Sequence, residues 1–188
     1  MYRLVAILLV SFAGTMPAAA FTIDFEEFSA GASSPLISGD YEIAASFNCD
    51  SQSPTCGAAV TAGNSFRVHS DPDFFDQSAV ITIERSDGGI FAAHSMDILF
   101  QSGNGELLGT TAQGDNLYVY DDLSVLGQGD WLNLVSFSYS VSIPGGTPVP
   151  AIIDIDNIVV TAVPIPAAAW LLGSALAGLG WFRRRQSV

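Results

Sequence analysis

Four carboxylates in two segments that are far apart in the chain are spaced in a way that could bind a hard cation. Asp24 and Glu26 alternate with apolar residues in FTIDFEEF, and Asp154 and Asp156 alternate with isoleucines in AIIDIDNIVVTA. If the apolar residues of two neighbouring strands face a core, these carboxylates face outward and converge. The cofactor that this pattern indicates is calcium, which prefers several oxygen ligands. A solvated acidic face with turn-forming residues is the alternative.

Three aromatic residues are candidates for contact with a sugar. Tyr118 and Tyr120 are two residues apart in NLYVYDD, so a strand would present both rings on one face. Trp131 follows Gly129-Asp130 at the expected start of another strand and is a third candidate. Aromatic rings with a few polar groups beside them are typical of ligand sites. Ordinary packing of aromatic residues, which β-strands favour, is the alternative.

The chain lacks the motifs of the common catalytic sites. It contains no G-x-S-x-G, no H-E-x-x-H, no P-loop and no dinucleotide-binding glycine pattern after a strand. Its two histidines, His69 and His94, lie in strand-like segments, which favours structural roles. The acidic residues show no recognisable paired motif of a glycosidase. We therefore expect a protein that is not an enzyme.

Cys49 and Cys56 bracket the segment CDSQSPTC. Two cysteines this close in an exported chain predict a disulfide. A metal pair is the alternative, but the segment contains no histidine and no second pair of cysteines.

Both ends of the chain carry targeting signals. Residues 1–20 have an early Arg, an apolar stretch and an A-x-A cleavage site, so they predict a signal peptide. Residues 165–182 form an apolar run without charge, long enough for a transmembrane helix. Arg183, Arg184 and Arg185 follow and predict a cytoplasmic C-terminus. We expect an exported protein that its tail holds at the inner membrane.

The tail resembles the PEP-CTERM family of C-terminal sorting signals, in its VPLPA-type form. The resemblance rests on Val163, Pro164, Pro166 and Ala167, followed by the apolar span and the three arginines within residues 163–188. Ile165 stands where the family has Glu or Leu. The resemblance implies processing by an exosortase-type enzyme during export, after which the protein reaches the cell surface or the extracellular matrix. A plain membrane anchor is the alternative.

Residues 21–162, here called the body, are strongly acidic and have the pattern of β-structure. Four of the six basic residues lie in the terminal segments, so the body holds two Arg against 19 acidic residues, a formal net charge of −17. Nucleic acid is excluded as a partner, because phosphate contacts require a basic surface. Apolar and polar residues alternate in several segments that glycine-rich turns separate, as in Val135–Ile143. The pattern predicts an all-β fold, an antiparallel, jelly-roll-like β-sandwich.

Three segments of the body, FTIDFEEF, ITIERSDGGIFAAHSMDILF and AIIDIDNIVVTA, resemble the jelly-roll domains of PEP-CTERM proteins, which are similar to carbohydrate-binding modules. The resemblance implies a structural calcium near the junction of the first and last strands, where it would involve Glu26 and Asp156. It also implies a non-catalytic surface or matrix protein that associates with exopolysaccharide or envelope glycan. A secreted glycan-active enzyme and a purely structural coat protein are the alternatives.

Overall fold

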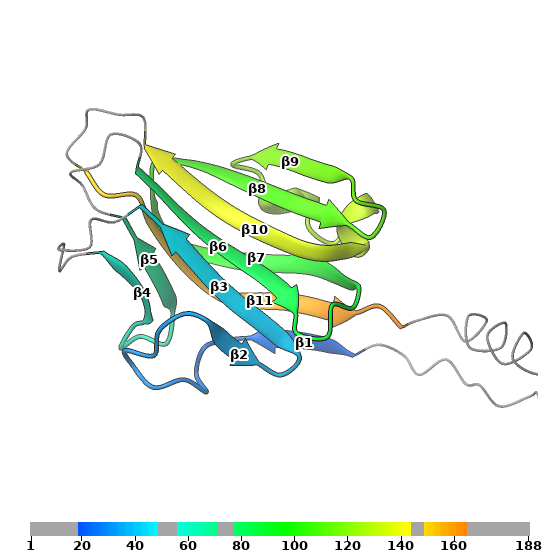
Figure 1. The fold of residues 1–188 in the computed structure, drawn as a ribbon, viewed down its shortest axis with the longest axis horizontal. Helices are drawn as coiled ribbons and strands as arrows, with labels where there is room; N and C mark the ends of the chain where they lie inside the picture. The colour runs from blue at the N-terminus through cyan, green and yellow to red at the C-terminus, as the bar shows by residue number, and fades with distance from the viewer. Residues whose placement is uncertain (1–18, 49–55, 71–76, 144–148, 165–188) are drawn as a thin grey trace, which may run out of the picture. The chain divides into compact units, whose positions relative to one another are not determined.

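The structure is a computed structural model that describes residues 19–48, 56–70, 77–143 and 149–164 (Figure 1). A compact unit extends from Ala19 to Val163. Among the described residues, no helix is long and apolar enough to cross a membrane. The predicted transmembrane helix 165–182 and residues 1–18 of the predicted signal peptide lie outside the described residues.

The described part of the chain is built from β-strands and two short 3-10 helices, which confirms the all-β prediction for this part. Every strand pairing is antiparallel. The elements in chain order are β1 (Ala20–Ile23), β2 (Leu36–Ser38), β3 (Tyr41–Phe47), β4 (Gly57–Val60), β5 (Phe66–His69), β6 (Gln77–Arg85), β7 (Phe91–Ser102), β8 (Asn104–Thr111), β9 (Asn116–Tyr120), η1 (Leu123–Val125), η2 (Gly129–Leu132), β10 (Leu134–Ile143) and β11 (Ile152–Ala162).

The strands form one curled sheet with two halves (Figure 1). One half has the order β2-β3-β6-β10-β8-β9, and the other has the order β7-β11-β5-β4, with β1 also paired to β11. A single pair of residues, Leu134 and Phe91, joins the halves through β10 and β7. The pairing of β1 with β11 places Ile23 opposite Ile158, so the first and last strands lie side by side as predicted.

The core lies between the two halves and is supplied by alternate residues of each strand. On β10, Phe137, Tyr139 and Val141 are buried, while the serines between them are partly exposed. Aromatic rings pack across the halves: the ring of Phe91 on β7 lies 5.7 Å from that of Tyr41 on β3 and 6.1 Å from that of Phe137. Each fully buried side chain of this size contributes about 1.5–3 kcal/mol to stability.

The first strand is shorter than its sequence pattern predicted. The alternation in FTIDFEEF predicted a strand through Glu26, but β1 ends at Ile23 and Phe25 has a left-handed φ of 56°. The side chain of Asp24 causes the turn by accepting a hydrogen bond from the Glu26 N–H at 3.2 Å. Phe25 remains fully buried, and its ring stacks on that of Phe66 at 5.6 Å. The prediction of a strand at Asp24–Glu26 was therefore wrong.

Candidate functional site

The tyrosines of β9 lie on the surface of the sheet. Tyr118 is 58% exposed and Tyr120 is 72% exposed, whereas Leu117 and Val119, which alternate with them, pack against the core. Two residues along a strand separate side chains of the same face by about 6.5 Å. The rings of Tyr118 and Tyr120 therefore form an exposed aromatic pair on one face of β9.

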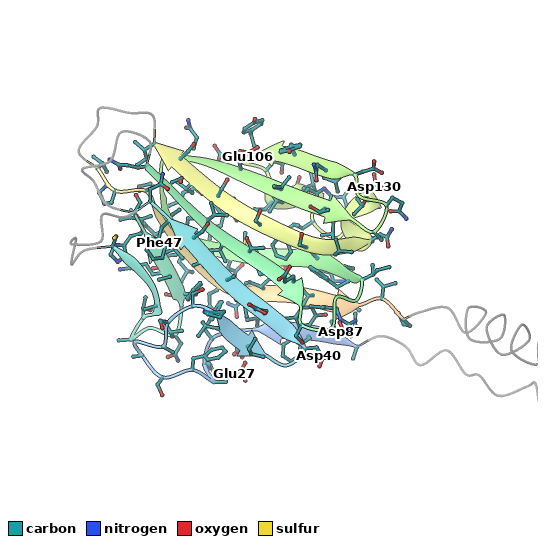
Figure 2. All side chains as sticks on the ribbon, viewed as in Figure 1. Glu27, Asp40, Phe47, Asp87, Glu106 and Asp130 are labelled. Carbon is teal, nitrogen blue, oxygen red and sulfur yellow. The ribbon has the colours of Figure 1, made fainter. Side chains whose placement is uncertain are left out.

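Small hydroxyl side chains occupy the neighbouring strands on the same face. The register from β9 through β8, β10 and β6 to β3 places Tyr118 in one row with Leu108, Ser138, Thr82 and Ala44. The next row joins Tyr120 to Glu106, Ser140, Val80 and Ser46, and Figure 2 shows Glu106 on this part of the sheet. We call this surface the outer face; its hydroxyl residues are Ser46, Ser78, Thr82, Thr110, Ser136, Ser138, Ser140 and Ser142.

A hollow lies at the β3 end of the outer face. It has a volume of about 520 Å³ and continues round the edge of the sheet: its lining includes Glu42 and Ala44 of the outer face, Ala45 and Phe47 of the opposite face of β3, and Ala58 of β4. Ala44 shares its row with Tyr118, four strands away. With about 4.8 Å between strands, the row from Tyr118 to the hollow is about 19 Å long. The outer face therefore offers an extended polar surface with aromatic rings at one edge and a hollow at the other.

Trp131 does not join the tyrosines. Its side chain is only 6% exposed and belongs to the core. The short helix η2 turns the ring inward over Gly109, where an added Cβ would lie 2.9 Å from the Trp131 Cζ3 atom. The prediction of Trp131 as a sugar-binding ring was wrong, because this ring fills the space that the absent side chain of Gly109 leaves.

Asp154 is held in an ion pair. It is 4% exposed, and its Oδ2 accepts hydrogen bonds from Arg67 Nε at 3.0 Å and from Arg67 Nη2. The two residues face each other in the register of β11 and β5. Oδ1 of Asp154 is buried and has no hydrogen-bond partner among the described residues. The prediction that Asp154 lies exposed beside Asp156 was wrong, because Arg67 covers it and takes up its charge.

The other predicted metal ligands are only partly brought together. Burial raises the pKa of Asp156, and the charges of Asp24 and Asp97 raise it further, against the hydrogen bond from the Asn157 N–H. Asp156 Oδ1 accepts that bond at 2.8 Å, and Asp97 Oδ2 accepts one from Asn157 Nδ2 at 3.0 Å. Glu26 is exposed. Within the described ranges, no three or more His, Cys, Asp or Glu side chains are grouped so that they could hold a metal ion.

A second cavity was not predicted from the sequence. Its volume is about 480 Å³, and it is lined by residues of β7, by Asp121 and Leu123 beyond the end of β9, and by Tyr139 of β10. Tyr139 donates a hydrogen bond to Gln101 Oε1, and Gln101 Nε2 donates one to Asp121 Oδ1 at 3.3 Å. No short motif marks this cavity, because its residues come from two strands, β7 and β10, and from the segment that follows β9.

The two histidines take part in local structure. His94 Nε2 lies 2.9 Å from the hydroxyl of Thr161, on the neighbouring strand. Burial lowers the pKa of His69, and the nearby charge of Arg67 lowers it further. Both histidines lie within strands, His69 at the end of β5 and His94 in β7, as the sequence indicated.

Several predicted residues lie at or beyond the limits of the described ranges. Cys56 directly precedes β4, but Cys49 lies outside, so the disulfide stays a prediction. Val163 donates its N–H to the Ile90 carbonyl at 3.0 Å. Pro164 is described, whereas the rest of the sorting motif lies outside: Pro166, Ala167, Arg183, Arg184 and Arg185.

Comparisons with known proteins found distant structural likeness only. No family model matches the chain, and no curated protein matches it. Two similar solved structures are mutants of CBM29-2, determined to probe ligand recognition by family 29 carbohydrate-binding modules. Each has 14% sequence identity to this chain and a TM-score of 0.44. The first match covers 77% of this chain and 92% of the solved chain, and the second covers 78% and 87%.

Proposed function

We propose that this protein is a non-catalytic glycan-binding protein whose outer face binds a neutral polysaccharide. The observation that supports this most is the exposed pair of Tyr118 and Tyr120, at 58% and 72% exposure. Large exposed aromatic side chains grouped on one face are typical of a binding surface. A sugar ring has an apolar face that stacks on such rings and hydroxyl groups that bond to their neighbours.

The rest of the outer face favours a hydroxyl-rich and uncharged ligand. Serine and threonine hydroxyls both donate and accept hydrogen bonds, so they match the hydroxyls of a glycan. The body has a formal net charge of −17 and only two basic residues. Both are paired, Arg67 with Asp154 and Arg85 with Asp87. An acidic polysaccharide would be repelled by this field, whereas a neutral one would not.

The test is affinity electrophoresis of the full chain through gels that contain a neutral or an acidic polysaccharide. We expect neutral polysaccharides to retard the protein, and the double substitution Tyr118→Ala/Tyr120→Ala to weaken binding about tenfold or more. Val149→Ala is the control, because Val149 is 47% exposed and does not belong to the outer face. Equal retardation of the double variant and the wild type would contradict the proposal.

The same assay separates the alternative functions. A glycan-active enzyme would release reducing ends from the polysaccharide during incubation. A purely structural coat protein would not be retarded by any polysaccharide. Retardation without release of reducing ends is the outcome that we expect.

We further propose that the chain is exported and sorted. The signal peptide, the apolar tail and the arginine cluster support this, together with the PEP-CTERM-like residues around Pro164. An exosortase-type enzyme is the partner that this resemblance implies. Before processing, the tail would hold the protein at the inner membrane; afterwards the protein would stand at the cell surface or in the extracellular matrix.

Calcium remains a proposal, now without Asp154: the candidate ligands are Asp24, Glu26 and Asp156, together with backbone oxygens. Like charges surround Asp156, and a bound cation would relieve their repulsion. If calcium binds, it should stabilise the folded chain more than magnesium does at equal ionic strength, since magnesium keeps its waters and demands an octahedral shell. Asp156→Asn should remove this difference in melting temperature. Equal stabilisation by the two ions would reduce the effect to screening of an acidic surface.

A further inference from the structure

We propose that the 480 Å³ cavity beside β7 is a second binding site, separate from the outer face, for a single neutral sugar unit such as the end of a glycan chain. The polar wall of the cavity is formed by Gln101, Asp121 and Tyr139, and the apolar wall includes Leu99 and Phe100.

The apolar wall exists because of a bulge in β7. The register with β11 pairs Asp154 with Phe100 and Ile155 with Ile98, so Leu99 is an extra residue in β7. In a regular strand two consecutive side chains point to opposite faces. Here Leu99 is 57% exposed and Phe100 is 50% exposed. Bulges often re-aim side chains next to functional sites, and this one leaves two large apolar side chains exposed at the cavity.

The polar wall is held in a fixed arrangement. Tyr139 is 1% exposed, and its buried hydroxyl donates to Gln101 Oε1, which orients the amide so that Nε2 donates to Asp121 Oδ1. Gly105 also donates its N–H to Asp121 Oδ1, at 2.9 Å. An added Cβ at Gly105 would lie 2.0 Å from the Tyr139 hydroxyl and 2.5 Å from Asp121 Oδ1. A residue without a side chain is therefore required at position 105 for these groups to meet.

Asp121 has an uncommon backbone conformation directly after the end of β9. Its φ of 48° is left-handed, which is uncommon outside glycine. Asp121 is exposed, and its Oδ2 accepts no hydrogen bond from the described residues. The second N–H of the Gln101 amide likewise donates no hydrogen bond to the described residues. An acceptor and a donor therefore stand beside each other at the cavity.

This combination selects a neutral sugar. A sugar hydroxyl donates and accepts at the same time, so it can bond to Asp121 Oδ2 and to the Gln101 amide together. The apolar face of a sugar ring can cover the ring of Phe100. An anionic ligand is disfavoured, because the cavity lining contains no basic residue and includes the carboxylate of Asp121. The volume is in the range of sites for small ligands.

The experiment is saturation-transfer difference NMR of the full chain with D-glucose, D-galactose, D-mannose and N-acetyl-D-glucosamine, each at millimolar concentration. At least one sugar should receive saturation from the wild type, and its affinity is then measured by titration. Phe100→Ala and Asp121→Asn should each weaken that sugar about tenfold or more. Asparagine tolerates a left-handed φ, so Asp121→Asn changes the acceptor without disturbing the backbone. Ile37→Ala is the matched control, an apolar residue of β2 that is 53% exposed and far along the sheet.

The outcomes distinguish this site from the outer face. Tyr118→Ala/Tyr120→Ala should keep the binding of the single sugar, and Phe100→Ala should keep the retardation by polysaccharide. If no sugar of the panel receives saturation, or if Phe100→Ala and Asp121→Asn bind it as the wild type does, the proposal is overturned. Loss of the sugar in the double tyrosine variant alone would assign it to the outer face instead.

Discussion

The carboxylate of Asp154 is the most deeply buried charge of the described residues, and replacing its partner Arg67 by methionine tests how much their ion pair stabilises the fold. The substitution keeps most of the length of the side chain and removes both hydrogen bonds to Asp154 Oδ2. The side chain of Asp154 is only 5% exposed, so water cannot replace these bonds, and its Oδ1 already has no partner among the described residues. Removing one member of a buried ion pair costs about 3–5 kcal/mol.

The expected loss lies at the lower end of that range. Arg67 is itself 50% exposed, so the wild-type pair is partly screened by solvent and is worth less than a fully buried one. We expect Arg67→Met to lower the free energy of unfolding by about 3 kcal/mol. For a domain of this size the melting temperature should fall by about 6–12 °C. The free energy is measured by urea unfolding of the full chain and the melting temperature by circular dichroism.

Two further variants show whether the unpaired charge of Asp154 causes the loss of stability in Arg67→Met. Arg85→Met is the matched control: it also removes a guanidinium, but the carboxylate that is left, Asp87, is 57% exposed and stays solvated, so the loss should be clearly smaller than for Arg67→Met. The double variant Arg67→Met/Asp154→Leu should recover most of the loss, because an apolar pair often replaces a buried ion pair without cost. The reasoning fails if Arg67→Met is no worse than Arg85→Met, or if the double variant is as unstable as Arg67→Met alone.

Three other predictions concern single features of the chain. Burial and the nearby charge of Asp121 raise the pKa of Tyr139 to about 12, although the hydrogen bond to Gln101 opposes this shift. Between pH 10 and about 12 the native state therefore keeps a proton that the unfolded chain has lost. The free energy of unfolding should fall as the pH rises through this interval. Urea unfolding across the interval should show a smaller fall for Tyr139→Phe. Cys49 and Cys56 should resist thiol labelling in the unfolded, unreduced exported protein, and two labelled thiols per chain would exclude the disulfide. Cys49→Ser should lower the free energy of unfolding by about 2–3 kcal/mol or less. Replacing Pro164 and Pro166 by Ala should leave export intact and block removal of the tail, as the mass of the C-terminal peptide of the surface form would show; a wild-type surface protein that still ends at Val188 would make the tail a plain anchor.

The strands could be predicted because each has one side toward a core. Polar and apolar residues alternate along β3, β6 and β10, and their buried positions are the apolar ones, such as Ile81 and Phe137. The exposed face of β9 followed from the same period, since Tyr118 and Tyr120 are two residues apart. The pairing of β1 with β11 was expected for a jelly-roll-like fold and is present.

The burial of Trp131 and Asp154 depends on contacts between distant parts of the chain. Trp131 is buried because Gly109, on another strand, leaves room for its ring. Asp154 is buried because Arg67, 87 residues earlier, meets it across β5 and β11. Nothing in the local pattern of either residue distinguishes it from an exposed one. The sequence pattern alone therefore predicts the burial of such charged and aromatic residues less well than that of the aliphatic residues around them.

The bulge in β7 shows a different reason why the pattern was insufficient. Period two assigns consecutive residues to opposite faces, and an inserted residue reverses that assignment for everything beyond it. Leu99 and Phe100 are both exposed, although an alternating strand would have buried one of them. The strand continues to Gln101, whose amide then meets Tyr139 and Asp121. A single extra residue therefore exposes the apolar wall of the cavity and brings Gln101 to the polar wall beside Tyr139 and Asp121, and a search for short motifs could not have found it.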